Sequence, residues 1–182
     1  MGEAYPLEVY MDTNWYVIQV KSGNEDKIAQ ACRLSIPKEI LIESFVPKYR
    51  LQKKFKGKWH LIEDVLFKGY VFLISDHIQD LFYQLSNIHE LTKLLGNDGN
   101  EIYPMTTQDV ILLEKFMKED YILDMSIGYI EGENVYISEG PLKGYEGLIT
   151  KIDRHKRIAY LDISFMGQQL TTKVGLEIIS KK

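Results

Sequence analysis

A glycine-rich stretch at residues 132–149, GENVYISEGPLKGYEGLI, constrains the fold of this chain more than any other segment. Val135 and Ile137 alternate with Asn134 and Tyr136, which is the period-two pattern of a half-buried strand. A Gly-Pro turn and two further glycines follow before a second apolar run begins. Glycine permits the tight bends and close backbone approach that a small closed barrel needs, whereas two glycines alone would favour an ordinary two-strand turn.

The composition is that of a folded protein whose charge is unevenly placed. The 182 residues suffice for one domain of ordinary size or for two small ones, and 45% of them are hydrophobic. The net charge of -4 excludes a protein that is basic throughout and coats nucleic acid. Acidic residues outnumber basic ones over residues 1–124, whereas residues 125–182 are close to balance. Local charged patches are therefore more informative than the total charge.

Cysteine usage and hydropathy indicate the cellular setting. The single cysteine, Cys32, excludes an intramolecular disulfide and is typical of a reducing compartment. No apolar run approaches the length of a membrane span, and residues 1–14 lack the basic and apolar regions of a secretion signal. We therefore expect a cytoplasmic monomer that makes no membrane contact.

The sequence lacks the common signatures of enzymes and of metal sites. Its four histidines are scattered without metal-ligand spacing, and one cysteine cannot complete a zinc site. Neither a P-loop nor a GxGxxG sequence occurs. No set of Ser, His and acid stands out, although such sets can be distant in sequence. We expect no catalytic residues, no metal and no cofactor.

Strand and helix signals alternate over the first two thirds of the chain. The pattern first predicts a strand over residues 15–21, a helix ending near residue 34, an extended segment over 43–49 and a polar hairpin tip over 51–63. It then predicts a strand over 64–74, a second helix after residue 76 and a short strand over 90–95. A Gly/Asn-rich loop over 96–100 and a third helix beginning at 106–109 follow. Ser22 with Glu25 predicts a capping box at the first helix, and Ser75 with Asp76 predicts a cap at the second. The second helix carries an apolar stripe that includes Phe82, which we expect in the core.

The order strand, helix, strand, strand, helix, strand is that of a ferredoxin-like split βαβ sandwich. The residues that follow have no convincing helical pattern, and residues 158–165 alternate cleanly between apolar and polar side chains. They predict a five-stranded barrel of the small SH3-like kind. The predicted fold class is α+β, with a lead-in over residues 1–14, a ferredoxin-like domain over 15–119, a linker over 120–129 and the barrel over 130–182.

Residues 48–60, KYRLQKKFKGKWH, form a basic patch within the acidic part of the chain. Cations interleaved with aromatic residues are typical of surfaces that bind single-stranded nucleic acid or an RNA hairpin. The alternative is a solvated hairpin whose lysines protect an edge strand. The candidate nucleic-acid-binding residues are Lys48, Arg50, Lys53, Lys54, Lys56, Lys58 and Trp59. A second, smaller basic patch at residues 154–157 is explained equally well as a charged turn.

Three segments together resemble the NusG family of transcription elongation factors. They are WYVIQV followed by Ser-Gly-x-Glu within residues 15–25, LFKGYVF at residues 66–72, and the glycine-rich stretch, which resembles the KOW motif. The three matches have the order and spacing of that family and cover nearly all of the chain from Trp15 onward. The resemblance implies an N-terminal NGN domain, a flexible linker and a C-terminal KOW domain.

The resemblance also implies that the NGN domain docks on the clamp helices of RNA polymerase through an aromatic pocket on its sheet. The matching positions are Trp15, Tyr16, Phe67, Gly69 and Tyr70. The alternative is that these aromatics are core residues of the sheet, which applies most strongly to Tyr16. We expect Phe67 and Tyr70 on opposite faces of their strand. The family commonly has Phe-Pro-Gly-Tyr here, and Lys68 in place of the proline puts the geometry of the pocket in doubt.

In the same family the barrel contacts other factors, such as a ribosomal protein or the terminator Rho. A phenylalanine in the last barrel loop makes the ribosomal contact. The closest match in this chain is Met166, beside Phe165, and these two residues are the candidate partner-binding residues of the barrel.

The basic hairpin and the sequence LTKLLG at residues 91–96 are more similar to the specialised paralogues RfaH and LoaP than to the housekeeping factor. Such paralogues are operon-specific antiterminators. We therefore expect processive antitermination, with the hairpin contacting RNA or the non-template DNA strand. Two alternatives stay open, a housekeeping elongation and pausing factor that couples polymerase to ribosome or Rho, and a ribosome-associated RNA-binding KOW protein.

Overall fold

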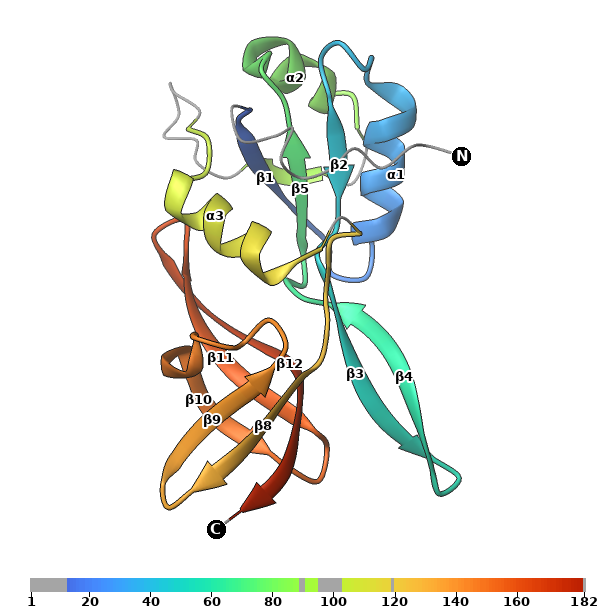
Figure 1. The fold of residues 1–182 in the computed structure, drawn as a ribbon. Helices are drawn as coiled ribbons and strands as arrows, with labels where there is room; N and C mark the ends of the chain where they lie inside the picture. The colour runs from blue at the N-terminus through green and yellow to red at the C-terminus, as the bar shows by residue number, and fades with distance from the viewer. Residues whose placement is uncertain (1–12, 89–90, 95–102, 119, 182) are drawn as a thin grey trace. The chain divides into compact units, whose positions relative to one another are not determined.

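The computed structural model describes residues 13–88, 91–94, 103–118 and 120–181. The chain divides into two compact units, one formed by residues 1–47 and 67–111 and the other by residues 48–66 and 112–182 (Figure 1). Most of the predicted lead-in and the whole predicted loop at residues 96–100 lie outside the described residues.

A four-stranded antiparallel sheet forms the centre of the first unit (Figure 1). Its strands, in the order β2-β5-β1-β6, are β2 (Glu43–Phe45), β5 (Tyr70–Ile74), β1 (Trp15–Val20) and β6 (Leu91–Leu94). Helix α1 (Glu25–Ser35) connects β1 to β2, and α2 (Ile78–Leu85) lies between β5 and β6 in the chain. This is the ferredoxin-like arrangement that the order of elements predicts.

Aromatic and branched residues of the central strands form the core of this unit. Val17 on β1 and Phe72 on β5 are paired in the sheet register and are fully buried. Phe72 stacks on Phe45 with ring centroids 5.5 Å apart, and Trp15 meets Phe45 edge-on at 5.2 Å. Each such side chain stabilises the fold by about 1.5–3 kcal/mol through burial alone.

Helix α1 packs through a narrow apolar face that includes Ile28, Ala29 and Cys32. Burial is the main cause that raises the pKa of the Cys32 thiol to about 11. The thiol is therefore protonated at neutral pH and serves as a small apolar core residue.

The predicted capping box at the start of α1 is wrong. Asn24 is the N-cap and makes no side-chain cap bond. The Glu25 carboxylate is instead 3% exposed and accepts hydrogen bonds from the backbone N–H of Gly23 and of Gly69, each at 2.7 Å. Because Gly69 lies immediately before β5, this carboxylate holds the helix start against a distant loop.

The predicted cap of α2 is also wrong, because the N-cap is His77. The Ser75 hydroxyl accepts the N–H of His77 at 3.0 Å, which places the serine in the turn before the helix. Only Leu81 and Leu85 of the predicted apolar stripe are buried, and Phe82 is 44% exposed rather than in the core. A helix of two turns presents too narrow a face to bury the whole stripe.

Helix α3 (Thr107–Phe116) begins where the sequence predicts. The Thr106 hydroxyl accepts the N–H of Asp109 at 3.2 Å, a side-chain cap that satisfies one otherwise unpaired amide of the first turn.

A five-stranded sheet in the order β10-β11-β12-β8-β9 forms most of the second unit. Its strands are β8 (Ser126–Glu131), β9 (Asn134–Glu139), β10 (Ile149–Asp153), β11 (Ile158–Phe165) and β12 (Gln168–Lys181), with a 3-10 turn, η2 (Glu146–Leu148), before β10. Strand β12 pairs antiparallel with β11 and parallel with β8. The alternation predicted for residues 158–165 is observed, and the predicted fold class is confirmed.

Gly140 is the residue of the glycine-rich stretch that the barrel most requires. Its φ is +98°, and an added Cβ would lie 2.6 Å from the Cα of Ser126. The Ser126 hydroxyl, which is buried, accepts the N–H of Leu142 at 3.1 Å. The turn between β9 and η2 therefore packs directly on the start of β8.

Two further strands of the second unit, β3 (Lys48–Phe55) and β4 (Lys58–Val65), form a long hairpin. A short strand, β7 (Ile122–Leu123), pairs parallel with β3, so the segment predicted as a linker contains β7 and the start of β8. The predicted polar tip over residues 51–63 is almost entirely strand, and only Lys56 and Gly57 form the turn, at φ of 48° and 78°.

The continuous strand predicted over residues 64–74 is interrupted. Strand β4 ends at Val65 and β5 begins at Tyr70. Gly69 has a φ of +85°, which favours glycine and breaks a strand. Among the described helices, none is long and apolar enough to cross a membrane.

Candidate nucleic-acid interface

The hairpin β3–β4 places its cations along two paired strands. Lys53 lies opposite His60, and Lys54 lies opposite Trp59, with the Lys54 ammonium 5.9 Å from the centre of the indole. The aliphatic stem of a lysine can cover an aromatic ring while its ammonium group stays in water. The sequence prediction of a basic surface with interleaved aromatic residues is therefore matched along this part of the hairpin.

The turn of the hairpin carries two more of the predicted cations. Lys56 and Lys58 are exposed at either side of Gly57, and the Lys56 ammonium lies 5.4 Å from the centre of the Phe55 ring. Phe55 is itself 63% exposed. The tip therefore combines exposed aromatic surface with positive charge. Lys48, by contrast, is half-buried at the base of the hairpin, where its backbone N–H donates to the Tyr121 carbonyl at 3.1 Å.

Arg50 does not belong to the exposed basic surface. Its guanidinium pairs with the carboxylates of Asp124 at 2.6 Å, Glu63 at 3.2 Å and Asp120 at 3.4 Å. Hydrogen bonds from Lys118 and then from Arg50 lower the pKa of Asp124. This ion-pair network connects β3 with the segment before β8. Because carboxylates neutralise its charge, Arg50 is a poor ligand for the phosphates of a nucleic acid.

The base of the hairpin packs against strand β12 of the barrel. An alanine Cβ at Gly175 would lie 2.3 Å from the Arg50 carbonyl oxygen, so the two backbones are in direct contact. The buried Thr172 hydroxyl donates to the Leu66 carbonyl at 2.6 Å. Tyr49 is fully buried, and its pKa is raised by burial and by the neighbouring Asp64. These contacts make the hairpin and the barrel one packed unit.

Arg157 makes a second connection between barrel and hairpin. It occupies the turn between β10 and β11 with a φ of 54°. Its guanidinium lies 4.2 Å from the centre of the Trp59 ring, donates to the Gln52 side chain and pairs with Glu177 at 3.0 Å. Tryptophan is the aromatic ring that attracts a guanidinium most strongly through its π face.

A cleft of about 390 Å³ lies where the outer part of the hairpin meets this turn of the barrel. The polar and aromatic residues that line it include Lys53, Lys54 and Trp59 from the hairpin and His155, Lys156 and Lys173 from the barrel. Asp64 is the single acidic residue among the lining side chains. The cleft therefore has cationic walls on both sides.

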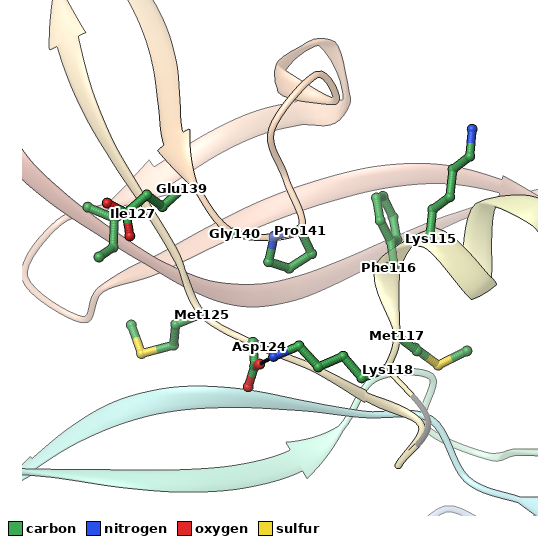
Figure 2. A pocket seen from close by; sticks show the side chains of 10 residues that line it. All are labelled: Lys115, Phe116, Met117, Lys118, Asp124, Met125, Ile127, Glu139, Gly140 and Pro141. Atoms are coloured by element: carbon green, nitrogen blue, oxygen red, sulfur yellow. Dashed lines mark hydrogen bonds and ion pairs between the residues drawn. The ribbon is translucent and has the colours of Figure 1, made fainter. Parts of the chain in front are cut away.

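A second hollow, of about 350 Å³, lies beside the end of α3 (Figure 2). In Figure 2 the Lys118 side chain extends to Asp124, and the Nζ to Oδ2 distance is 2.5 Å. Met125 and Pro141 supply apolar walls, while the Lys115 side chain points away from the others. The ion pair of Lys118 with Asp124 neutralises two of the charges in its lining, so this hollow is a weaker candidate for a charged ligand.

The residues predicted to bind RNA polymerase lie in the first unit and are mostly buried. Trp15, Tyr16 and Phe67 are 1%, 3% and 3% exposed, and Gly69 is buried at the turn held by Glu25. Tyr70 is half-buried and is the most exposed of the five. Their polymerase contact stays a prediction, in which Tyr70 supplies side-chain surface and the other four shape the site.

The predicted placement of Phe67 and Tyr70 on opposite faces of one strand is wrong. Phe67 precedes β5 and packs on Phe72 with ring centroids 5.9 Å apart, whereas Tyr70 is the first residue of β5. The break at Gly69 removes the simple alternation that the prediction requires.

The predicted partner-binding pair of the barrel lies at the hairpin between β11 and β12. Phe165 is 3% exposed and Met166 is half-buried at the turn, with a φ of 46°. Their contact with a partner stays a prediction, and Met166 supplies the accessible surface. Among the described residues, no group of three or more His, Cys, Asp and Glu side chains is arranged to hold a metal ion.

Fold and sequence together define the class of the protein, a ferredoxin-like domain joined to a small KOW-type barrel. The profile of the family described as transcription termination factor NusG matches residues 13–114, and that of the KOW motif matches residues 131–162. The chain belongs to the NusG family.

Curated relatives align over almost the whole chain. The transcription termination/antitermination protein NusG of Campylobacter jejuni is 25% identical over 171 residues, which cover 92% of this chain and 96% of the relative. That of Borreliella burgdorferi is 25% identical over 183 residues, covering 94% and 100%. A solved structure titled "Domain interaction in Thermotoga maritima NusG" has a TM-score of 0.54 at 17% identity, with coverage of 93% and 96%, and thus shares the fold.

Sequence reasoning missed the barrel side of the cleft. The basic patch at residues 154–157 is visible in the sequence, but nothing there indicates that it lies beside Lys53 and Lys54. Lys173 gives no signal, because a half-buried lysine on an alternating strand is ordinary. The acidic partners of Arg50 are equally hidden, since two of them lie about 70 residues away in the chain.

Proposed function

We propose that this protein is a transcription termination/antitermination factor that binds RNA polymerase and promotes processive antitermination of specific operons. The observation that carries the proposal is the match of the NusG profile to residues 13–114 followed by the KOW motif at residues 131–162. An N-terminal polymerase-binding domain followed by a C-terminal barrel is the order that the sequence resemblance implies. We place its action in the cytoplasm, where transcription occurs.

The clamp helices of RNA polymerase are the proposed contact of the first unit. Tyr70 opens strand β5 with part of its ring accessible, and the exposed Lys68 lies two residues before it. Glu25 fixes the intervening Gly69 by accepting its N–H at 2.7 Å. An aromatic side chain on a rigid turn is suited to binding a helical partner, because aromatic residues dominate the energy of most interfaces.

Nucleic acid is the proposed contact of the hairpin in the second unit. Lys53, Lys54, Lys56 and Lys58 are exposed, and none of them has an acidic residue directly opposite it in the hairpin register. A hairpin of this charge near a transcribing polymerase would bind RNA or the non-template DNA strand through phosphates. This contact favours a specialised antiterminator over a factor that acts through polymerase alone.

The housekeeping role is the second candidate function, and Met166 is the residue on which its ribosomal contact depends, since it stands where the family has a phenylalanine. This residue lies at the turn between β11 and β12, the loop for which the family resemblance implies a ribosomal contact. Retention of ribosomes by the wild-type chain but not by Met166→Ala would support that role.

Retention on immobilised core RNA polymerase tests the polymerase contact. We expect wild type to bind and Tyr70→Ala to bind about tenfold or more weakly, because truncating a central interface aromatic commonly has that cost. Tyr83→Ala is the matched control, since Tyr83 is 70% exposed on α2 of the same unit. Failure of the wild type to bind, or equally weakened binding in both variants, would contradict the proposed docking surface.

A further inference from the structure

We propose that Lys156 and Lys173 of the barrel complete the nucleic-acid site of the hairpin, and that a single strand of RNA lies in the cleft between them. This inference rests on the nucleic-acid contact proposed above for the hairpin. It goes beyond that contact because it assigns the barrel a direct share in binding, and it places the ligand between two structural elements.

The residues that line the cleft give it a positive charge. Lys53 and Lys54 line one wall, and Lys156 and Lys173 line the other, together with His155. Lys156 pairs with Asp153 at 3.5 Å, but its side chain is 70% exposed and that pair contributes little in water. Four lysines among the lining residues, with Asp64 as the single acidic one, favour a ligand that repeats a negative charge along its length.

Contacts between the hairpin and the barrel hold the two walls of the cleft in place. Arg157 stacks on Trp59 and pairs with Glu177, so the turn that presents Lys156 is fixed against the hairpin. At the base, Gly175 brings the backbone of β12 against that of β3. The two walls are thus pre-organised, which reduces the ordering cost of binding a flexible strand.

The shape of the cleft favours one strand over a duplex. A cavity of about 390 Å³ with a wall on each side can admit a short part of one extended strand, which would continue beyond it in both directions. A duplex is convex and wide, and its phosphates would reach the rims of such a cleft but not its interior. Grooves that track a single strand combine cations with aromatic surface in the same way.

Asp64 favours RNA over DNA. Asp64 is among the lining residues, and its carboxylate accepts hydrogen bonds from the Val65 N–H at 2.9 Å and the Tyr49 hydroxyl at 3.4 Å. A 2′-hydroxyl, which only RNA possesses, is a donor that this carboxylate can bind, whereas the carboxylate repels phosphate.

Fluorescence anisotropy with the full chain and a fluorescein-labelled RNA of mixed sequence, about 12 nucleotides long, tests the proposal. We expect Lys156→Glu/Lys173→Glu to weaken binding roughly tenfold per lysine, as for removal of a charge-assisted hydrogen bond. The slope of log affinity against log salt should fall in magnitude by about 1.4, or 0.7 for each phosphate that is no longer neutralised. The matched control is Lys143→Glu/Lys181→Glu, which makes the same charge change at two exposed barrel lysines outside the lining.

Three results would overturn the inference. Equally weakened binding in the two double variants would show that only total charge matters. A DNA strand of the same sequence that binds as tightly as the RNA would exclude the role given to Asp64. Wild-type affinity in Lys156→Glu/Lys173→Glu, together with weakened binding in Lys53→Glu/Lys54→Glu, would restrict binding to the hairpin and leave the proposed function intact.

Wild-type affinity in both Lys156→Glu/Lys173→Glu and Lys53→Glu/Lys54→Glu would instead overturn the hairpin contact as well. Thermal unfolding of every variant checks that the barrel is folded. Lys156→Gln/Lys173→Gln, which removes charge without reversing it, replaces the reversal if the latter unfolds. The glutamine pair should then show the same decrease in salt slope.

Discussion

Replacing Gly175 with alanine is expected to destabilise the second unit by about 1–3 kcal/mol, the usual cost of overpacking a closely packed site. The added Cβ would lie 2.3 Å from the Arg50 carbonyl oxygen and 2.7 Å from Cγ of Met125. The first of these atoms belongs to the backbone of β3, which cannot move without disturbing the hairpin. Thermal unfolding followed by circular dichroism measures the effect, and a decrease of several degrees in Tm is expected.

Gly147→Ala is the matched control for that experiment. Gly147 lies in η2 of the same unit, and an added Cβ there meets nothing within 4 Å. Its φ is outside the positive range, so alanine is tolerated and the Tm should be unchanged or slightly higher. An equal Tm in Gly175→Ala and Gly147→Ala would contradict the packing of the hairpin on β12, and with it the cleft.

Reversing the charge of three exposed hairpin lysines is expected to weaken nucleic-acid binding and to reduce its dependence on salt. In Lys53→Glu/Lys54→Glu/Lys56→Glu three exposed hairpin cations become anions. If each of these lysines neutralises one phosphate of a single strand, the slope of log affinity against log salt should fall in magnitude by about 2. Titration of the labelled RNA at several salt concentrations measures this slope.

Arg50→Lys is a comparison variant that distinguishes an effect on nucleic-acid binding from an effect on the stability of the fold. Arg50 is held by three carboxylates, so its exchange should lower the Tm while leaving the salt slope close to that of wild type. An unchanged affinity in the triple lysine variant would contradict nucleic-acid binding by the hairpin. A reduced slope in Arg50→Lys would contradict the view that its charge is already neutralised.

Much of the fold could be predicted from local sequence patterns. The alternation at residues 158–165 indicates β11, and Thr106 marks the start of α3 through a cap that the structure contains. Such features depend on a few neighbouring residues, which is why they can be recognised in one sequence. The five strands of the barrel and the ferredoxin-like order follow from a sum of signals of this kind.

Features that depend on distant partners could not be predicted. The sequence pattern predicts that Glu25 caps α1, but its carboxylate binds the N–H of Gly69, 44 residues away. The strand predicted over residues 64–74 is broken at the same glycine. Phe82 falls on an apolar stripe that predicts a core position, yet α2 buries only Leu81 and Leu85. In each case tertiary contacts override the local preference.

The candidate site also combines features that the sequence predicts with features that only the structure shows. The cations of the hairpin are evident from composition, and their interleaving with Trp59 follows from strand register. The partners of Arg50 and the approach of Lys156 and Lys173 require the packed structure, because they join segments about 70 to 120 residues apart. The hairpin could therefore be proposed as a site from the sequence, whereas the cleft could not.

Readthrough of an intrinsic terminator by purified RNA polymerase tests the central claim most directly. The template should place a transcribed leader between the promoter and the terminator, so that nascent RNA is available to the hairpin. The account predicts that wild type raises readthrough and that Tyr70→Ala does not, although the variant keeps the wild-type Tm. Readthrough that is unchanged by wild type at concentrations that saturate polymerase binding would contradict antitermination and favour the housekeeping role.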